Sequence, residues 1–268
     1  MEVKFLGQGF EEESPGAVGH HLLQFLTQRD YHTFTAISAF AGESGIQGLF
    51  NKLEEAKSYF QYINLIIGVD MKGTSKEALE AILRLDINSF VFYNKTATIF
   101  HPKIYLFEGD EKAEIIIGSS NLTAKGLFQN VEASVLISII KSDPIDLAFL
   151  DSVKAYFAGL FDFSDPNLQR LSNELIEYLV EANIVPLEKE RREMQEKTKI
   201  VIEGLKDSKI EFFPPRQVPK IPPAFLASIR RSKKEVARPI PQVGARPSAT
   251  EPLVSRGILV WIKNKLPN

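Results

Sequence analysis

The sequence predicts an α/β fold built in layers, with a mixed central β-sheet flanked by helices. Between residues 16 and 93, short apolar runs alternate with amphipathic segments, which is typical of a largely buried sheet covered by helices. After residue 97, apolar runs follow one another with little helix between them, which predicts further strands of mixed direction. A chain of 268 residues is long enough for one large domain, or for one domain with an appendage.

The first half of the chain is predicted to alternate between helices and strands. The helices are indicated by apolar side chains at helical spacing and, in two cases, by a capping box in which a Ser or Thr precedes a Gln or Glu by three positions. The predicted order is a helix over 16–26, a strand over 33–40, a helix opened by Ser44 and Gln47, a strand over 63–69, a helix opened by Thr74 and Glu77, and a strand over 89–93.

The middle of the chain is predicted to hold three strands, over residues 97–107, 113–117 and 131–140. The pairs Asp143-Pro144 and Asp165-Pro166 each place an N-cap residue before a proline at the first helical position. We therefore expect helices after both pairs, ending near residues 161 and 182.

Polar residues interrupt these apolar strands in a pattern that indicates catalysis. His101 and Lys103 are two positions apart, so on a strand they would share one face of the sheet. Ser119 and Asn121 lie in a Gly-Ser-x-Asn turn after the second strand, and Glu132 begins the third. Together they supply a nucleophile or base, a fixed cation, two neutral hydrogen-bonding groups and a carboxylate, the parts needed to attack a phosphodiester without a metal.

Each part alone has an ordinary structural interpretation. A His-x-Lys pair can be a polar pair on an edge strand, and Gly-Ser-x-Asn is a common turn sequence. The combination favours a functional site, because His101 and Lys103 stand where a β-rich run would otherwise carry apolar residues or Thr.

These residues resemble the signature of the phospholipase D superfamily, His-x-Lys followed by an acidic residue and then Gly-Ser-x-Asn, known as the HKD motif. The resemblance extends over roughly residues 1–185 and is to the branch of restriction endonucleases and helicase-linked nucleases. It implies that His101 is the nucleophile, Lys103 the phosphate-binding lysine, Ser119 and Asn121 the hydrogen-bonding pair, and Glu132 the accompanying carboxylate. Glu108 stands where the superfamily usually has Asp, so the sequence leaves its role open.

The resemblance also carries expectations about activity and partners. It implies a metal-independent DNA endonuclease that forms a phosphohistidine intermediate and uses neither a cofactor nor a metal. Its chemistry needs two HKD motifs and this chain has a single one, so we expect a homodimer with the active site at the interface. A helicase or ATPase subunit is a further possible partner. The alternatives are a phospholipase D-type lipid phosphodiesterase and a non-catalytic partner subunit that keeps the fold.

Composition narrows the setting of the protein. No apolar run reaches the roughly 18 residues of a membrane helix, so no membrane association is expected. The chain has no cysteine, and its N-terminal stretch lacks the features of a secretory signal, so we expect a cytoplasmic protein. His20, His21 and His32 lack the spacing to acidic residues or further histidines that a metal site requires.

Charge and proline content predict the division into domains. Residues 187–268 hold 18 Lys or Arg and 9 Asp or Glu, which leaves 14 and 25 for residues 1–186. We expect a nuclease domain over 1–186 and a charged helix followed by an extended, basic, proline-rich linker over 187–250. The strand-like end, residues 251–268, is expected to begin a truncated C-terminal domain for DNA recognition.

Overall fold

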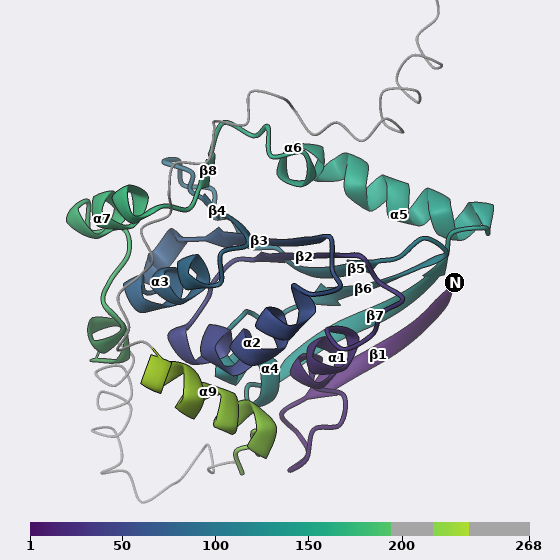
Figure 1. Cartoon of the computed structure of the whole chain (residues 1–268), viewed down its shortest axis with the longest axis horizontal. Coiled ribbons are helices and arrows are strands. Elements are labelled where there is room, and N and C mark those ends of the chain that lie inside the picture. Colours follow the sequence, from purple (N-terminus) through teal and green to yellow (C-terminus); the bar gives the residue numbers. More distant parts are fainter. Residues whose placement is uncertain (194–216, 236–268) are drawn as a thin grey trace, which may run out of the picture.

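The computed structural model describes residues 1–193 and 217–235, and in them a single mixed sheet of eight strands forms the centre (Figure 1). The strand order is β1-β7-β6-β5-β2-β3-β4-β8. Only the β2–β3 and β3–β4 pairs are parallel, and the other neighbours are antiparallel. The strands are β1 (Glu2–Gln8), β2 (Thr33–Ser38), β3 (Tyr62–Gly68), β4 (Asn88–Phe92), β5 (Lys103–Glu108), β6 (Lys112–Gly118), β7 (Glu132–Ile140) and β8 (Leu168–Arg170). The predicted α/β class with a mixed sheet is confirmed.

Helices cover both faces of this sheet. One face carries α1, α2, α3, α4 and α9, and the other carries α5 and α6 (Figure 1). The helices are α1 (Val18–Phe25), α2 (Glu43–Ala56), α3 (Lys76–Arg84), α4 (Ala124–Phe128), α5 (Pro144–Tyr156), α6 (Ala158–Phe161), α7 (Asn173–Glu181) and α9 (Pro223–Glu235), with a 3-10 turn, η1 (Asp70–Lys72). In the part of the chain that the structure describes, none of these helices has the length and apolar character needed to cross a membrane.

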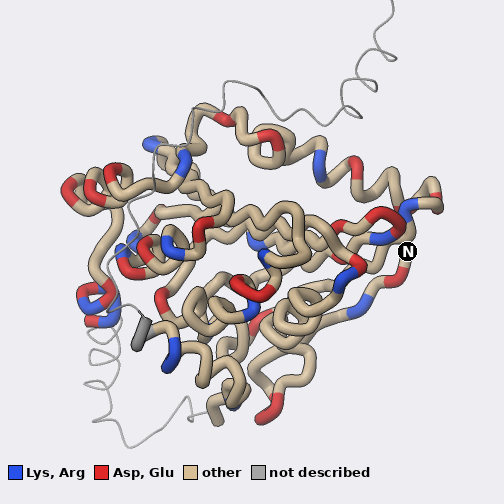
Figure 2. Tube along the Cα trace, viewed as in Figure 1, with Lys and Arg blue, Asp and Glu red and all other residues tan. Residues whose placement is uncertain are grey.

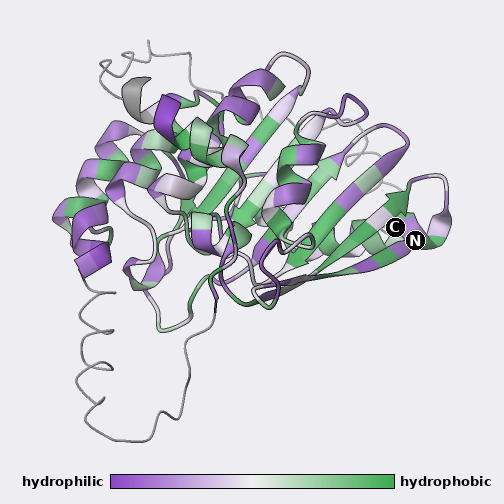
Figure 3. Ribbon diagram, turned by 90° about the horizontal axis from the view of Figure 1, so that it is seen from below, coloured by the Kyte–Doolittle hydropathy of each residue, from purple (hydrophilic) through white to green (hydrophobic). Residues whose placement is uncertain are grey.

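The core consists of two apolar layers, one on each face of the sheet. Alternate strand residues point to opposite faces, so Tyr105 and Phe107 of β5 join the layer below α1 and α2, while Ile104 and Leu106 join the layer below α5. Figure 3 shows the strands as largely hydrophobic ribbons between helices of mixed character. This burial on both faces explains why the strands appear in the sequence as continuous apolar runs.

Three predicted helix caps are wrong at the level of single residues. The N-cap of α2 is Gly42 and not Ser44, and the N-cap of α3 is Ser75, whose side chain accepts from the Ala78 N–H. Thr74 is instead buried, where its hydroxyl donates to the Gly68 carbonyl oxygen at 2.7 Å. Asp165 caps no helix, because the chain turns there and then enters β8. The two capping boxes marked the starts of α2 and α3 to within two residues, whereas the Asp165-Pro166 pair marked no helix. Tertiary contacts decided which side chain became the cap.

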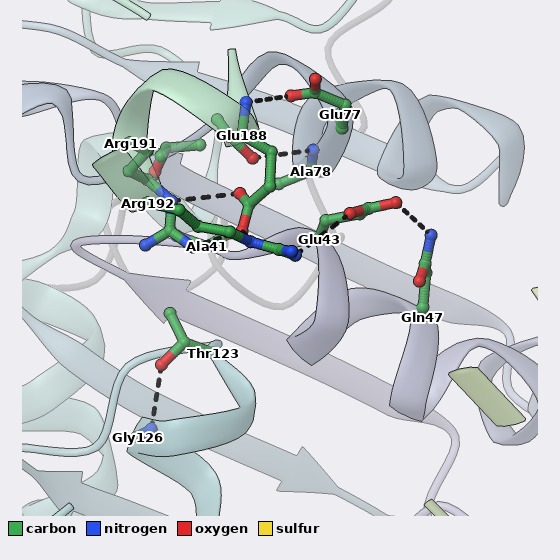
Figure 4. Close-up of polar contacts among 12 residues, drawn as sticks. Ala41, Glu43, Gln47, Glu77, Ala78, Thr123, Gly126, Glu188, Arg191 and Arg192 are labelled. Carbon is green, nitrogen blue, oxygen red and sulfur yellow. Dashed lines mark hydrogen bonds and ion pairs between the residues drawn. The ribbon is translucent and has the colours of Figure 1, made fainter. Parts of the chain in front are cut away.

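The described residues directly after Pro186 pack against the same body. Glu188 is buried, and its backbone N–H donates to Glu77 Oε2 at 2.6 Å (Figure 4). Its carboxylate accepts from Arg191 at 2.7 Å and from Arg192 at 3.1 Å. Burial acts to raise the pKa of Glu188, but the hydrogen bond from Arg191 and its neighbours hold that pKa below the usual value. Arg192 also lies 3.8 Å from Glu43 in the first turn of α2.

The expectation of an extended linker over residues 187–250 is wrong at Pro223–Glu235, which forms helix α9. Phe225 is fully buried, and its ring meets that of Phe128 edge-on with centroids 4.7 Å apart. The Ser228 hydroxyl donates to the Gln47 carbonyl oxygen of α2 at 2.8 Å. Phe225 and Ser228 are three positions apart, so they lie on the same face of the helix, and both are buried. These contacts outweigh the tendency of the flanking prolines toward an extended chain, and the segment therefore packs as a helix. The predicted C-terminal domain, residues 251–268, lies outside the described residues.

Candidate active site

The predicted histidine and lysine lie at the point where the chain enters the centre of the sheet. β5 begins at Lys103, so His101 precedes the strand and does not share it, contrary to the expectation of a strand from residue 97. Pro102 accounts for this start, because it has no N–H to contribute to a strand ladder. Its carbonyl oxygen instead accepts from the Ala39 N–H at 2.9 Å, which fixes the entry of the chain beside the end of β2.

His101 and Lys103 are nevertheless in direct contact. The Lys103 ammonium lies 2.8 Å from His101 Nδ1 and donates to the His101 carbonyl oxygen at 2.9 Å. Lys103 is buried while His101 is exposed, so the cation is fixed beneath an accessible imidazole. Burial lowers the pKa of Lys103, and burial followed by the lysine charge lowers the pKa of His101. The imidazole is therefore favoured in its neutral, nucleophilic form.

The loop that presents His101 is held from two sides. Asp70, in η1, is buried, and its Oδ2 accepts from the Phe100 N–H at 2.8 Å. The ring of Phe40 meets the His101 ring edge-on, with centroids 5.7 Å apart. Sequence reasoning missed both residues. An acidic residue directly after the strand of residues 63–69 was the available signal for Asp70.

Ser119 and Glu132 form a second contact at the ends of β6 and β7. The Ser119 hydroxyl donates to Glu132 Oε2, and it accepts from the Ala133 N–H at 3.1 Å. The other carboxylate oxygen accepts from Asn130 Nδ2 at 3.0 Å. Glu132 acts electrostatically on Lys103, where it opposes the fall of that pKa. The carboxylate is thus oriented by Ser119 and Asn130, and these contacts do not include the His101 ring.

Asn121 connects the second strand of the motif to the histidine loop. Its Oδ1 accepts from the Phe40 N–H at 3.2 Å, and Phe40 is the residue whose ring contacts His101. Nearby, the Leu122 N–H donates to the hydroxyl of Ser38, the β2 residue opposite Lys103. Because the acceptor oxygen of the Asn121 amide is used internally, its N–H donors are the groups that can face a bound phosphate.

Glu108 has no place in this site. It ends β5, five residues beyond Lys103, which corresponds to about 16 Å along a strand. Its carboxylate is buried and accepts from Lys154 of α5 at 2.9 Å, with Lys141 at 3.8 Å. The acidic residue of the motif therefore forms an ion-paired anchor between the sheet and α5 in this chain.

A cavity of about 370 Å³ opens beside His101. It lies between the start of β5, the end of β6 and the last turn of α5. Tyr156, 82% exposed, is among its lining residues and was not predicted from the sequence. Within residues 1–193 and 217–235, no group of three or more His, Cys, Asp or Glu side chains could hold a metal ion.

A comparison with known protein families shows to which family the chain belongs. Residues 21–157 match the family model described as the NgoFVII restriction endonuclease N-terminal PLD domain. The chain belongs to this family. The matched segment includes all five residues expected in the site, and PLD denotes the phospholipase D superfamily whose signature the sequence resembles. No curated protein matches the chain by sequence.

Solved structures with a similar arrangement include phospholipase D relatives. Nuc from Salmonella typhimurium, a phospholipase D family member, has a TM-score of 0.42 and 18% identity, over 63% of this chain and 97% of its own. NucT from Helicobacter pylori has a TM-score of 0.44 and 13% identity, over 60% and 96% respectively. Yeast tyrosyl-DNA phosphodiesterase has a TM-score of 0.36 and 10% identity, over 52% of this chain and 33% of its own.

Proposed function

We propose that the chain is a metal-independent phosphodiesterase that cleaves DNA as an endonuclease through a phosphohistidine intermediate. The observation that carries this proposal is the contact between the buried Lys103 ammonium and the exposed His101 imidazole. A neutral imidazole beside a fixed cation combines a nucleophile with the positive charge that attracts a phosphate. The family of restriction endonuclease PLD domains supports DNA as the substrate.

In the first step, a ring nitrogen of His101 attacks phosphorus and the bond from phosphorus to the leaving oxygen breaks. The histidine of a second protomer, in its protonated form, gives its proton to that oxygen. Lys103 and the Asn121 amide donate to the non-bridging oxygens as negative charge builds on them. The products are a phosphohistidine and one free DNA end.

In the second step, water attacks phosphorus and the phosphorus–nitrogen bond breaks. The second histidine, now neutral, accepts the proton of that water, so both histidines return to their starting states. Glu132 would keep the site electrostatically balanced against the two lysines while Ser119 holds its carboxylate in place. Positive charge comes from the lysines throughout, so the scheme requires no metal.

This chemistry requires a homodimer with His101 of both protomers at the interface. An exposed His101 on the surface of the described chain is compatible with such a twofold arrangement. We also propose that sequence recognition resides outside residues 1–186, in the C-terminal part of the chain. We further propose that the protein is cytoplasmic and that a helicase or ATPase subunit is a partner.

Lys and Arg alternate with Asp and Glu along the surface elements of the described chain (Figure 2). Helix α9 carries two exposed basic residues, Arg230 and Arg231, on the side of the helix away from the buried Phe225 and Ser228. We propose that this helix adds phosphate-backbone contacts, which would make DNA binding strongly dependent on salt. Such contacts position DNA but carry no sequence preference.

The decisive experiment is cleavage of supercoiled plasmid in EDTA by the purified chain and by its His101→Ala variant. Cleavage by the wild type and its loss in the variant, with DNA binding retained, would support the proposal. His32→Ala is the matched control, because this histidine lies at the opposite end of β2 and contacts Asp110 and Thr33. An acid-labile phosphate on His101 after reaction with a nitrophenyl phosphodiester would identify the intermediate. Full activity of His101→Ala, or a strict requirement for Mg²⁺, would overturn it.

A further inference from the structure

The cavity beside His101 has a composition unlike that of a phosphate site. Its floor is formed by Ile104 and Ile117, which are directly paired neighbours on β5 and β6. Its wall is one side of the last turn of α5, with Val153 and Tyr156 three positions apart. Both floor residues belong to the apolar layer beneath α5, so the cavity extends that layer to the surface.

Besides Tyr156, the lining residues with polar side chains are His101, Lys103 and Ser152. His101 and Lys103 lie at the entry to β5, and Ser152 lies on α5. The Ser152 hydroxyl donates to the Phe149 carbonyl oxygen at 2.7 Å, which leaves its oxygen able to accept. Lys103 is the one Lys or Arg among the lining residues, and in the proposed function its ammonium holds the scissile phosphate beside His101.

Tyr156 gives the cavity an aromatic border. It is 82% exposed although it is a large side chain, and its ring meets that of Phe157 edge-on with centroids 4.7 Å apart. That contact supports the ring from one side and leaves a flat face available. Exposed aromatic faces of this kind bind nucleic-acid bases by stacking, and they do so with little dependence on base identity.

We propose that this cavity is a binding site for the base of the nucleotide next to the scissile phosphate, with Tyr156 as the stacking platform. The inference rests on the proposed function of His101 and Lys103 at the phosphate. A nucleoside is attached to the phosphate covalently, so an apolar, aromatic cavity lined by His101, the proposed nucleophile, has the position and the chemistry for its base. A cavity of about 370 Å³ is within the size range of small-ligand sites.

The proposal has a consequence for substrate preference. A base inside a duplex is stacked on its neighbours and cannot occupy a lateral cavity unless it is first unstacked. The chain should therefore bind and cleave single-stranded or locally unpaired DNA better than a continuous duplex of the same sequence.

The test compares two small phosphodiesters that differ in having a base. Thymidine 5′-(p-nitrophenyl phosphate) carries one, and methyl p-nitrophenyl phosphate does not. For Tyr156→Ala we expect kcat/KM for the thymidine ester to fall about tenfold through KM, the loss of one stacking contact, with the methyl ester unaffected. Tyr156→Phe should keep the preference. Tyr178→Ala is the matched control, a 53% exposed tyrosine on α7.

A binding measurement separates this inference from the proposed function. A methyl phosphodiester of 2-aminopurine deoxynucleoside should lose fluorescence on binding to the wild type and to Tyr156→Phe, but not on addition of Tyr156→Ala. Quenching without cleavage of either ester would support the base site and refute the proposed function. Equal cleavage of both esters without quenching would support the proposed function and refute the base site.

Two other results would overturn the base site. One is a change of oligomeric mass in Tyr156→Ala by light scattering, which would assign the residue to a contact between protomers. The other is competition by short-chain phosphatidylcholine but not by thymidine 5′-methyl phosphate, which would assign the cavity to a lipid.

Discussion

The ammonium group of Lys103 lies 2.8 Å from Nδ1 of His101, although the histidine precedes the strand on which the lysine lies. The contact depends on Pro102, which separates the histidine from the first residue of the strand. The Pro102 carbonyl oxygen accepts from the Ala39 N–H. The lysine is buried and the histidine exposed. This arrangement gives a fixed cation and an accessible imidazole, and the protonation state of His101 is the first property to measure.

The pKa of His101 should be below its usual value of 6.5, because burial and then the charge of Lys103 disfavour the imidazolium. In the proposed mechanism kcat/KM should therefore fall as the pH drops below 6.5, because the attacking histidine becomes protonated, and also at higher pH, because the histidine of the second protomer loses the proton that it donates. Lys103→Met should raise the His101 pKa by removing the neighbouring charge. Titration of the ring resonances by NMR, with His101→Ala for assignment, measures both. An unchanged pKa in Lys103→Met would contradict the electrostatic account.

Ser119 and Glu132 should act as a unit. We expect Glu132→Gln and Ser119→Ala each to lower kcat, and the double variant to lose less than the sum of the two, because the hydroxyl orients the carboxylate. The matched control lies on the same two strands, where the Ser138 hydroxyl donates to Glu114 Oε2 at 2.7 Å. Glu114→Gln and Ser138→Ala should leave kcat unchanged. Additive effects at Ser119 and Glu132 would show that the two residues act independently.

Asp70 should position the histidine loop without taking part in the chemistry. Asp70→Ala removes the acceptor of the Phe100 N–H and leaves that group unpaired, at a cost of about 1–3 kcal/mol in stability. We expect kcat to fall about tenfold with little change in KM, since the loop carries His101 out of alignment. Asp70→Asn retains an acceptor oxygen and should restore most of kcat. If Asp70→Asn is as impaired as Asp70→Ala, the charge of Asp70 is required, and the role assigned to it is wrong.

Helix α9 should contribute to the stability of the domain. Phe225 is fully buried against α2, where a Cβ added at Gly48 would lie 2.0 Å from the Phe225 ring. Phe225→Ala should therefore lower the free energy of unfolding by about 3–5 kcal/mol. Leu226→Ala, at a neighbouring position with 38% exposure, should lower it by much less. Denaturant unfolding of both variants makes the comparison, and Gly48→Ala should resemble Phe225→Ala. Equal stability of all three with the wild type would show that α9 does not pack in solution.

The sequence by itself determined the α/β class, most of the strands and the residues of the motif. Strands buried on both faces must be apolar throughout, so residues 63–69 and 131–140 could be assigned from composition alone. The motif was visible because polar residues such as His101 and Lys103 are unexpected in such runs. The edge strand β1 was not predicted. Its first four residues alternate in polarity but are all exposed, so the pattern marks no buried face of a sheet.

Only the tertiary structure decided how these residues are used. Glu108 is in the sequence position of a motif acid, but β5 carries it to the opposite end of the strand, where Lys154 of a later helix meets it. Phe225 follows a proline-rich stretch, and its partners Gly48 and Phe128 are far away along the chain. Local patterns report which backbone conformation a segment favours. Contacts between distant segments depend on how the whole sheet and its helices pack, and no local pattern records that.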